Sequence, residues 1–227
     1  MSQFYQDYVY GNQHGFKQKA VIIPNGAGNE FMDVSFDFKK EYGINTEHIL
    51  LTVANHYFAK GHQFVIDAFI RMKQDNVTLV IIGELPHNHS WYSCYFICKS
   101  YNLLNGNIKI LKDVPREFVV SAYQQSSIFL LGSHVECAPL VLYEAFASRT
   151  PFISTNVGNI SDYSDYLITV NNSNDMALEV NKLLADPVGR NKMANKAFDL
   201  WRSKYSWDSI TLQYETLFNE ITSTFHT

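Results

Sequence analysis

The hydrophobic residues of this chain fall into short apolar runs that alternate with longer segments of helical spacing. Runs rich in Val, Ile, Leu and Phe are typical of strands in a parallel sheet, because helices cover both faces of such a sheet. We predict seven strands, at residues 20–23, 49–54, 78–82, 108–111, 128–131, 152–154 and 167–170. Apolar positions three and four residues apart predict helices at residues 64–72, 91–101, 117–125, 141–147, 175–184, 189–204 and 208–225.

This alternation predicts an α/β fold, a Rossmann-like parallel sheet with helices on both faces, followed by C-terminal helices. Pro187 and Ser206 are the expected breaks between the last helices. Residues 1–19 have weak periodicity, and we interpret them as a linker or the remnant of an upstream region. Residues 20–227 then form one domain.

Composition limits the classes of partner. Of the 227 residues 46% are hydrophobic and 18% are charged, enough for a substantial core. The net charge of −4 argues against a general binder of nucleic acid or anionic membranes, which needs a basic surface. Three cysteines, no apolar leader segment and no apolar run long enough to span a membrane favour a reducing, cytoplasmic location.

The strongest chemical signal is a pair of glutamates, Glu136 and Glu144, that follows the predicted strand at 128–131. Glu136 is expected in the loop at the carboxyl end of that strand, where open parallel sheets bind ligands, and Glu144 on the next helix. The backbone N–H groups of residues 137–141 would form a helix start that attracts anions. One acid can approach a reacting sugar carbon while the other accepts hydrogen bonds from a ribose. Spacing alone leaves open that these are two ordinary acids.

Two further strand ends carry weaker signals. Lys60 and Gly61 follow the predicted strand at 49–54, and a lysine can neutralise a diphosphate as a point charge. Gly61 would let the backbone approach a ligand closely. Gly83 ends the strand at 78–82 and leaves room at the same edge. Each of these alone is equally consistent with an ordinary surface lysine or a strand-end glycine.

A fourth group contains residue types that suit zinc. These are His87, His89, Cys94 and Cys98. Their spacing matches no common zinc finger or ribbon, and the two cysteines have the positions of helix-face residues. We therefore favour loop histidines and core cysteines over a zinc site.

Five segments occur in an order that is typical of one enzyme family. They are Pro24-Asn25-Gly26, Lys60-Gly61, Ile81-Ile82-Gly83, Glu136 to Glu144 with seven residues between, and the block from Thr150 to Asn159. In this order they resemble the C-terminal domain of the group 1 (family four) glycosyltransferases, which have the GT-B fold. The resemblance covers about nine-tenths of the chain.

The resemblance implies transfer of a sugar from a nucleoside-diphosphate (NDP) sugar to an acceptor hydroxyl, with retention of anomeric configuration. It implies neither a metal nor a cofactor, because the NDP-sugar is a substrate. Fixed cations and helix amides would stabilise the departing diphosphate. The residues implied in catalysis are Glu136 and Lys60. Those implied in donor binding are Asn55, Lys60, Gly61, Gly83, Val114, Glu136, Cys137, Ala138, Leu140, Val141 and Glu144.

The chain departs from the family pattern at several positions. Asn55 stands where the family usually has arginine, and the adjacent His56 is a candidate for part of that role. Cys137 stands where the family usually has glycine, and Arg149-Thr150 stands where the family has a small residue followed by glycine. These departures motivate an alternative function, a non-catalytic interaction or regulatory module. An NDP-sugar epimerase and a flavodoxin-like binding protein are more distant alternatives.

The resemblance also implies a second half. GT-B active sites lie between two Rossmann-like domains, and residues 1–19 are too few to form the acceptor-binding one. We therefore expect that domain upstream or in a separate chain, and an isolated domain with little turnover. The full enzyme could associate peripherally with a membrane. The last helix would then have a partly exposed apolar face made of Ile210, Tyr214, Leu217, Phe218 and Ile221.

Overall fold

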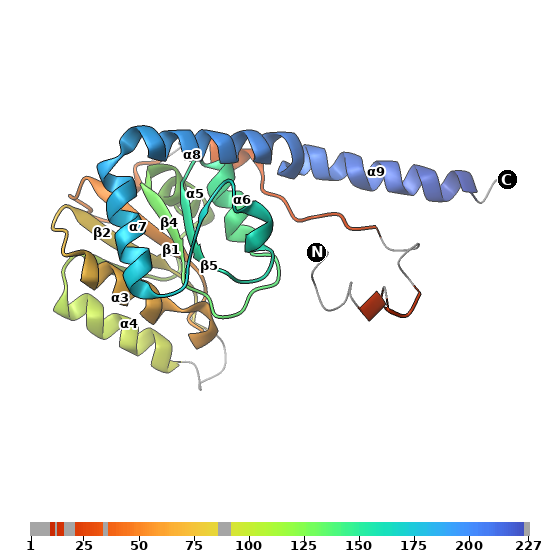
Figure 1. The fold of residues 1–227 in the computed structure, drawn as a ribbon. Coiled ribbons are helices and arrows are strands. Elements are labelled where there is room, and N and C mark those ends of the chain that lie inside the picture. Colours follow the sequence, from red (N-terminus) through yellow and green to blue (C-terminus); the bar gives the residue numbers. More distant parts are fainter. Residues whose placement is uncertain (1–9, 12, 16–20, 34–35, 86–91, 225–227) are drawn as a thin grey trace.

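Six parallel strands form the centre of the molecule in the computed structural model, which describes residues 10–11, 13–15, 21–33, 36–85 and 92–224 (Figure 1). The strands are β1 His48–Val53, β2 Val77–Ile82, β3 Ile108–Leu111, β4 Ile128–Leu131, β5 Phe152–Thr155 and β6 Ile168–Val170. Their order in the sheet is β3-β2-β1-β4-β5-β6, and every neighbouring pair is parallel. Six of the seven predicted strands are therefore confirmed, each within one residue at either end.

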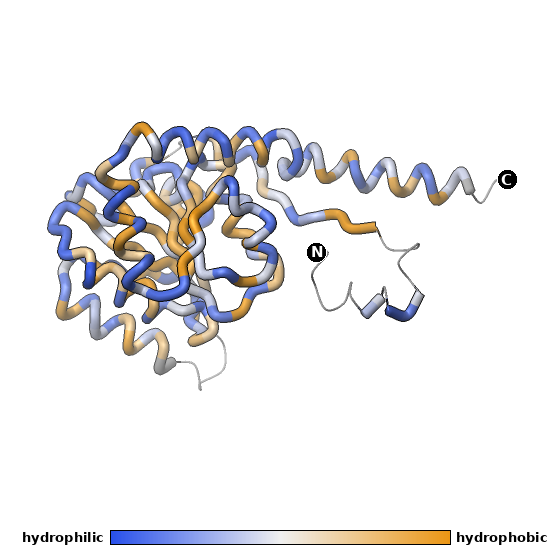
Figure 2. The backbone as a smooth tube through the Cα atoms, viewed as in Figure 1, coloured by the Kyte–Doolittle hydropathy of each residue, from blue (hydrophilic) through white to orange (hydrophobic). Residues whose placement is uncertain are grey.

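Helices cover both faces of the sheet, as predicted. One face packs against α3 His62–Met72, α4 Tyr92–Leu104 and α7 Ser173–Ala185. The other packs against α5 Arg116–Gln125, α6 Leu140–Ala147 and α8 Pro187–Leu200. Figure 2 shows the hydrophobic strands enclosed between these layers.

Side chains of each strand alternate between the two layers, since successive residues of a strand point to opposite faces. In β1, Leu50 joins the cluster under α3 and α7, whereas Ile49 and Leu51 join the cluster under α5 and α6. All three are fully buried, which explains why β1 is a continuous apolar run in the sequence.

The predicted first strand is wrong. Residue 20 lies outside the described residues, and residues 21–23 have no regular secondary structure. Val21, Ile22 and Ile23 instead line a groove with Leu212 and Leu217 of α9, which spans Trp207–Thr224. The strand-like composition thus reflects packing against a helix rather than pairing in the sheet.

The segment between this run and β1 contains two short helical elements that sequence periodicity did not predict. They are the 3₁₀ turn η2 Asn29–Met32 and the one-turn helix α2 Phe38–Glu41. Each is four residues long, too short for a helical period, yet each buries one aromatic ring completely, Phe31 and Phe38. Of the predicted linker, residues 10–11 and 13–15 alone are described.

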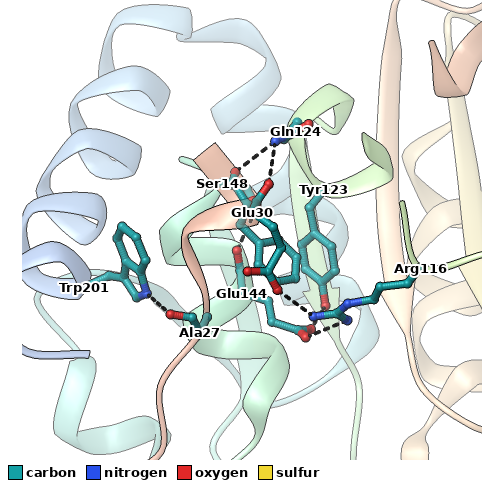
Figure 3. Close-up of polar contacts among 9 residues, drawn as sticks. Ala27, Glu30, Arg116, Tyr123, Gln124, Glu144, Ser148 and Trp201 are labelled. Atoms are coloured by element: carbon teal, nitrogen blue, oxygen red, sulfur yellow. Dashed lines mark hydrogen bonds and ion pairs between the residues drawn. The ribbon is translucent and has the colours of Figure 1, made fainter. Parts of the chain in front are cut away.

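The C-terminal helices run along the sheet layer and then extend beyond it (Figure 1). After α8 the chain forms a π-helical turn, Trp201–Tyr205, and Ser206 precedes α9, so both predicted breaks are confirmed. Trp201 Nε1 donates a hydrogen bond to the carbonyl of Ala27 at 3.2 Å (Figure 3). This bond and the Trp201 side chain, which is 1% exposed, fix the start of the domain to its end.

The apolar face predicted for the last helix divides into two parts. The face is partly exposed, as predicted: Ile210 is buried, because it packs where α9 leaves the body of the domain. Tyr214, Phe218 and Ile221 are exposed and Leu217 is half-buried. Among the described helices, α9 included, none has the length and apolar character needed to cross a membrane.

Candidate functional site

A cavity of about 600 Å³ opens at the carboxyl ends of β1, β2 and β4, where Val53, Ile82 and Leu131 line it. The strand order of the sheet reverses between β1 and β4. Ligands of open α/β sheets bind at such a switch point, because the loops on either side diverge and leave a crevice. The volume is within the range of small-molecule sites.

The first charged pair of this cavity joins Lys60 and Glu136. Lys60 ends the short 3₁₀ turn η3 Phe58–Lys60 after β1, and its Nζ lies 2.8 and 3.0 Å from the two carboxylate oxygens of Glu136. Ser133 Oγ donates a further hydrogen bond to Glu136 at 2.7 Å. The Glu136 side chain is only 11% exposed, so these two donors hold its carboxylate in one orientation beside the cavity.

The second charged pair joins Arg116 and Glu144. Glu144 lies on α6 and accepts hydrogen bonds from Arg116 Nη1 at 3.1 Å and from the Tyr123 hydroxyl at 2.7 Å (Figure 3). Arg116 also contacts Glu30 at 3.4 Å. Burial, followed by the negative charge of Glu144, raises the pKa of Tyr123 well above its ordinary value. Tyr123 therefore keeps its proton and remains a donor to Glu144.

The start of α6 supplies the third polar feature. Pro139 precedes the helix and has no N–H, and within the described chain no side chain caps this end. Ala138, Leu140 and Val141 line the cavity beside it. The helix begins at Leu140, so the free amides of its first turn start there and not at residue 137. Their orientation and partial positive charge favour an anion, whose binding stays a prediction.

The rim of the cavity on the β2 side is made of backbone and amide groups. Asn55 Oδ1 accepts a hydrogen bond from the Glu84 amide at 3.2 Å, and Glu84 Oε1 accepts one from the Asp113 amide at 2.9 Å. These bonds connect the loops that follow β1, β2 and β3. Gly83 and Val114 line the cavity next to them.

The structure places nine of the predicted site residues around this one cavity. They are Asn55, Lys60, Gly83, Val114, Glu136, Ala138, Leu140, Val141 and Glu144. Residues from five separate loops and helices therefore converge, as the resemblance implies. Their individual roles remain predictions.

Two predicted residues do not line the cavity. Gly61 has a left-handed backbone (φ +64°), and a Cβ there would collide with the carbonyl of Gly132. The absence of a side chain at Gly61 therefore permits contact between two loops rather than approach to a ligand. Cys137 is exposed, and its backbone carbonyl lies against Gly158.

Sequence reasoning missed several polar residues of the site, and two of them, Arg116 and Tyr123, hold Glu144. Arg116 begins α5 directly after Pro115, at the carboxyl end of β3, and it supplies a guanidinium to the cavity. A cation at the helix start after a strand was a signal in the sequence. Tyr123 gave no such signal, since a buried tyrosine in α5 has the pattern of a core residue.

His56 does not take the place of the family's arginine. It is fully buried and does not line the cavity, although its neighbours Asn55 and Tyr57 do. Its backbone N–H donates to the Glu84 carbonyl at 3.1 Å, which turns its side chain into the protein. A guanidinium does line the cavity, but it belongs to Arg116, from a different loop.

Comparison with known families identifies the group that shares this arrangement. The model of the family "Glycosyl transferases group 1" matches residues 34–199. N-acetyl-alpha-D-glucosaminyl L-malate synthase of Bacillus anthracis is 28% identical over 190 residues, which are 81% of this chain and 48% of that protein. Alpha-D-kanosaminyltransferase of Streptomyces kanamyceticus is 23% identical over 86% of this chain and 53% of its own. The chain thus spans about half the length of the curated relatives it matches.

Solved structures share the fold at lower identity. Anabaena HepE in complex with UDP has a TM-score of 0.83 at 17% identity and covers 96% of this chain and 62% of its own. The C-terminal domain of the group 1 protein LpcC from Francisella tularensis has a TM-score of 0.67 at 23% identity, over 80% of this chain and 99% of that domain. A separately crystallised C-terminal domain, which aligns with four-fifths of this chain, therefore shares the fold described above.

Proposed function

The chain belongs to the group 1 glycosyl transferases and has the Rossmann-like GT-B fold, and from this we propose that it is the donor-binding domain of a retaining, metal-independent glycosyltransferase. The domain would hold an NDP-sugar whose sugar passes to an acceptor hydroxyl. One observation carries the proposal: Lys60, Arg116, the start of α6 and two glutamates face a single cavity at the switch point of the sheet.

The diphosphate of the donor matches the cationic side of this cavity. Breaking the sugar–phosphate bond leaves negative charge on the NDP, which a metal-free site must stabilise with fixed positive groups. Lys60 and the α6 amides are on the side of Glu136, and Arg116 is on the side of Glu144. Because each cation already has a carboxylate partner, a bound diphosphate would have to share Lys60 and Arg116 with those carboxylates, and the α6 amides would supply the further positive charge.

The two glutamates suit different parts of the donor. Glu136 is held by Lys60 and Ser133 near the α6 start, where the sugar would lie if the diphosphate meets those amides. Glu144 is oriented by Arg116 and Tyr123, and its free lone pairs can accept hydrogen bonds from ribose hydroxyls. Gly83 and Val114 would then face the base. The UDP and UDP-glucose complexes of HepE support a nucleotide-sugar ligand for this fold.

The acceptor would be bound by a second domain. The chain spans about half of its relatives, so we propose that an upstream segment or a separate chain completes the active site. This isolated domain would bind the donor and turn it over slowly or not at all. An alternative, motivated by Asn55 at a position where the family has arginine, is a module that has lost donor binding and serves in protein interaction or regulation.

Titration calorimetry with UDP, GDP and ADP tests donor binding on this domain directly. We expect at least one NDP to bind below millimolar concentration. Lys60→Ala removes a charge-assisted contact of about 1.5–3 kcal/mol, so the Kd should rise by roughly tenfold to a hundredfold.

Lys192→Ala is the matched control, because Lys192 is an exposed lysine of α8 outside the cavity. In Lys60→Ala the carboxylate of Glu136 loses its cation, and this unpaired charge could itself weaken NDP binding. The double variant Lys60→Ala/Glu136→Gln removes that charge and so isolates the loss of the ammonium group. No binding of any NDP at millimolar concentration, or equal affinity of the Lys60 and Lys192 variants, would favour the non-catalytic module.

A further inference from the structure

Two histidines and two cysteines meet beneath the donor cavity, on the face of the sheet covered by α3 and α4. They are His56, His62, Cys94 and Cys98, and one ligand atom from each lies within 4.8 Å of all the others. None of the four side chains is more than 1% exposed. The described residues therefore contain a compact, buried group of nitrogen and sulfur atoms.

Three separate segments bring these residues together. His56 lies three residues after β1, and His62 is the first residue of α3. Cys94 and Cys98 are four residues apart on α4 and so face the same side of that helix. His62 Nδ1 is 3.6 Å from Cys94 Sγ, and the rings of His56 and His62 meet edge to face at 4.7 Å.

The imidazole nitrogens of this group lack ordinary partners. Both nitrogens of His56 and Nε2 of His62 are buried without a hydrogen-bond partner among the described residues. Buried polar atoms almost always have a partner, and each exception requires an explanation. Here one nitrogen of each imidazole lies within 4.8 Å of two thiols, which are themselves metal ligands, so a single ion could take up one nitrogen of each ring.

We propose that His56, His62, Cys94 and Cys98 bind one zinc ion. Two sulfur and two nitrogen ligands in tetrahedral arrangement are typical of structural zinc. With Zn–S near 2.3 Å and Zn–N near 2.0 Å, the ligand atoms of such a site are about 3.3–3.8 Å apart. The present group has a maximum separation of 4.8 Å, so a contraction of about 1 Å would close it around the ion.

A two-iron cluster fits these positions less well. Iron–sulfur centres with two histidines and two cysteines place the histidines on one iron and the cysteines on the other. Here a histidine nitrogen and a cysteine sulfur are already in contact at 3.6 Å, which leaves no room for two irons between them. The geometry therefore favours a mononuclear site.

The four ligands determine how retention of the ion should depend on pH. Zinc binds thiolates and neutral imidazoles, so its binding releases the thiol protons of Cys94 and Cys98. Retention of the ion should therefore fall as the medium becomes acidic.

The ion would act on structure and not on the transfer reaction. Four protein ligands leave no open coordination position, and none of the four lines the donor cavity. The site would connect α4 to the loop after β1. That loop carries Asn55, Tyr57 and Lys60, so a bound ion would fix one wall of the cavity.

Metal analysis of the untagged protein, produced in zinc-supplemented medium, tests the proposal. We expect about one zinc per chain in the wild type and in Cys137→Ser, whose cysteine is exposed and outside the group. Cys94→Ser and Cys98→Ser should each lose most of it. Zinc far below one per chain in the wild type, or equal zinc in all four proteins, would overturn the proposal, as would iron in its place.

Cobalt binding gives a second test, which needs only the wild-type protein. After removal of the metal, added Co²⁺ should produce thiolate-to-cobalt charge-transfer absorption in the near ultraviolet and strong visible bands typical of a tetrahedral ion. Zinc should then abolish both. If Co²⁺ gives only the weak bands of an octahedral ion, the four residues form an aromatic and thiol packing cluster.

Discussion

The loop after β1 contributes residues to two polar clusters that differ in how their polar groups are paired. On one side Lys60 lies at the cavity proposed to bind the donor, where its ammonium contacts Glu136, and Arg116 contacts Glu144 in the same way. On the other side His56 enters the buried group with His62 and two cysteines, where three imidazole nitrogens have no partner among the described residues. Only a few residues of one loop separate the two.

The difference indicates what each cluster requires from a ligand. Charges that are paired next to a cavity are stable without a ligand and can extend their contacts to one that arrives. Buried imidazole nitrogens without partners carry a desolvation cost that persists until something binds them. A reversible substrate site is expected to have the first character, and a site for a permanently bound ion the second.

Removal of the proposed zinc ion should have the largest effect on stability. If it had no effect, the buried group would not be an ion site, and the contrast between the two clusters would be wrong. An ion present at about a thousand times its Kd contributes about 4 kcal/mol to the free energy of unfolding. For a domain of this size the melting temperature should then fall by roughly 8–16 °C when a chelator removes the ion. Differential scanning calorimetry before and after chelation measures the shift.

Cys98→Ser should melt at the temperature of the chelated wild type and should not respond to chelator. Cys137→Ser, with both buried thiols intact, should behave as the wild type in both conditions. A chelator that lowers the melting temperature of Cys98→Ser and of the wild type equally would mean that the ion it removes is bound elsewhere.

The role of Glu144 can be separated from that of Lys60 by a deoxy nucleotide. If Glu144 accepts ribose hydroxyls, the wild type should bind an NDP about tenfold more tightly than analogues that lack the 2′- or 3′-hydroxyl, since a hydrogen bond to a charged group contributes about 1.5 kcal/mol or more. Glu144→Gln should reduce this ratio to a few fold. Calorimetric titration with the three nucleotides gives each ratio.

Lys60→Ala provides the control for this ratio. It should weaken the NDP and the deoxy analogues by the same factor, because the diphosphate is common to all. If Glu144→Gln also weakened all three ligands equally, then Glu144 would act on the diphosphate, and the division of labour between the two glutamates would be wrong.

The sequence predicted the parts of the site that depend on strand ends and failed where distant helices meet. Glu136 and Lys60 follow buried strands, and parallel strands bring their carboxyl ends to one edge, so their convergence was predictable. Tyr123 reaches Glu144 only because α5 and α6 pack on the same face of the sheet, and spacing along the chain does not contain that contact.

The buried cysteine–histidine group is a second case in which sequence spacing did not predict a contact between distant segments. Cys94 and Cys98 were recognised as possible ligands, but proximity in sequence associated them with His87 and His89, which lie outside the described residues. The structure brings His56 and His62 to them instead, from a loop more than thirty residues upstream. The failed strand at residues 20–23 has a related cause, since composition cannot distinguish pairing in a sheet from packing on a helix.

The smallest effect is expected from the hydroxyl of Tyr123, which tests whether the paired state of the cavity is itself important. Tyr123→Phe removes the hydrogen bond to Glu144 and should cost about 1 kcal/mol of stability, or roughly 2–4 °C in melting temperature. Because the folded pKa of Tyr123 is raised, the wild type holds its phenolic proton where the unfolded chain has lost it. The stability contributed by this difference in pKa is fully present below about pH 10. As the pH rises above that value, the free energy of unfolding falls by about 1.4 kcal/mol per pH unit.

Tyr143→Phe is the matched control for this last variant. Tyr143 is also fully buried, with a pKa that burial raises, but its hydroxyl contacts Tyr163 and Asn159 away from the cavity. Both variants should therefore show a shallower loss of stability above pH 10 in urea titrations. Only Tyr123→Phe should also weaken NDP binding, by a few fold, because Glu144 would then be held by Arg116 alone. Equal NDP affinity in the two variants would show that Arg116 by itself orients Glu144, and that the buried hydroxyl contributes to the fold and not to the ligand site.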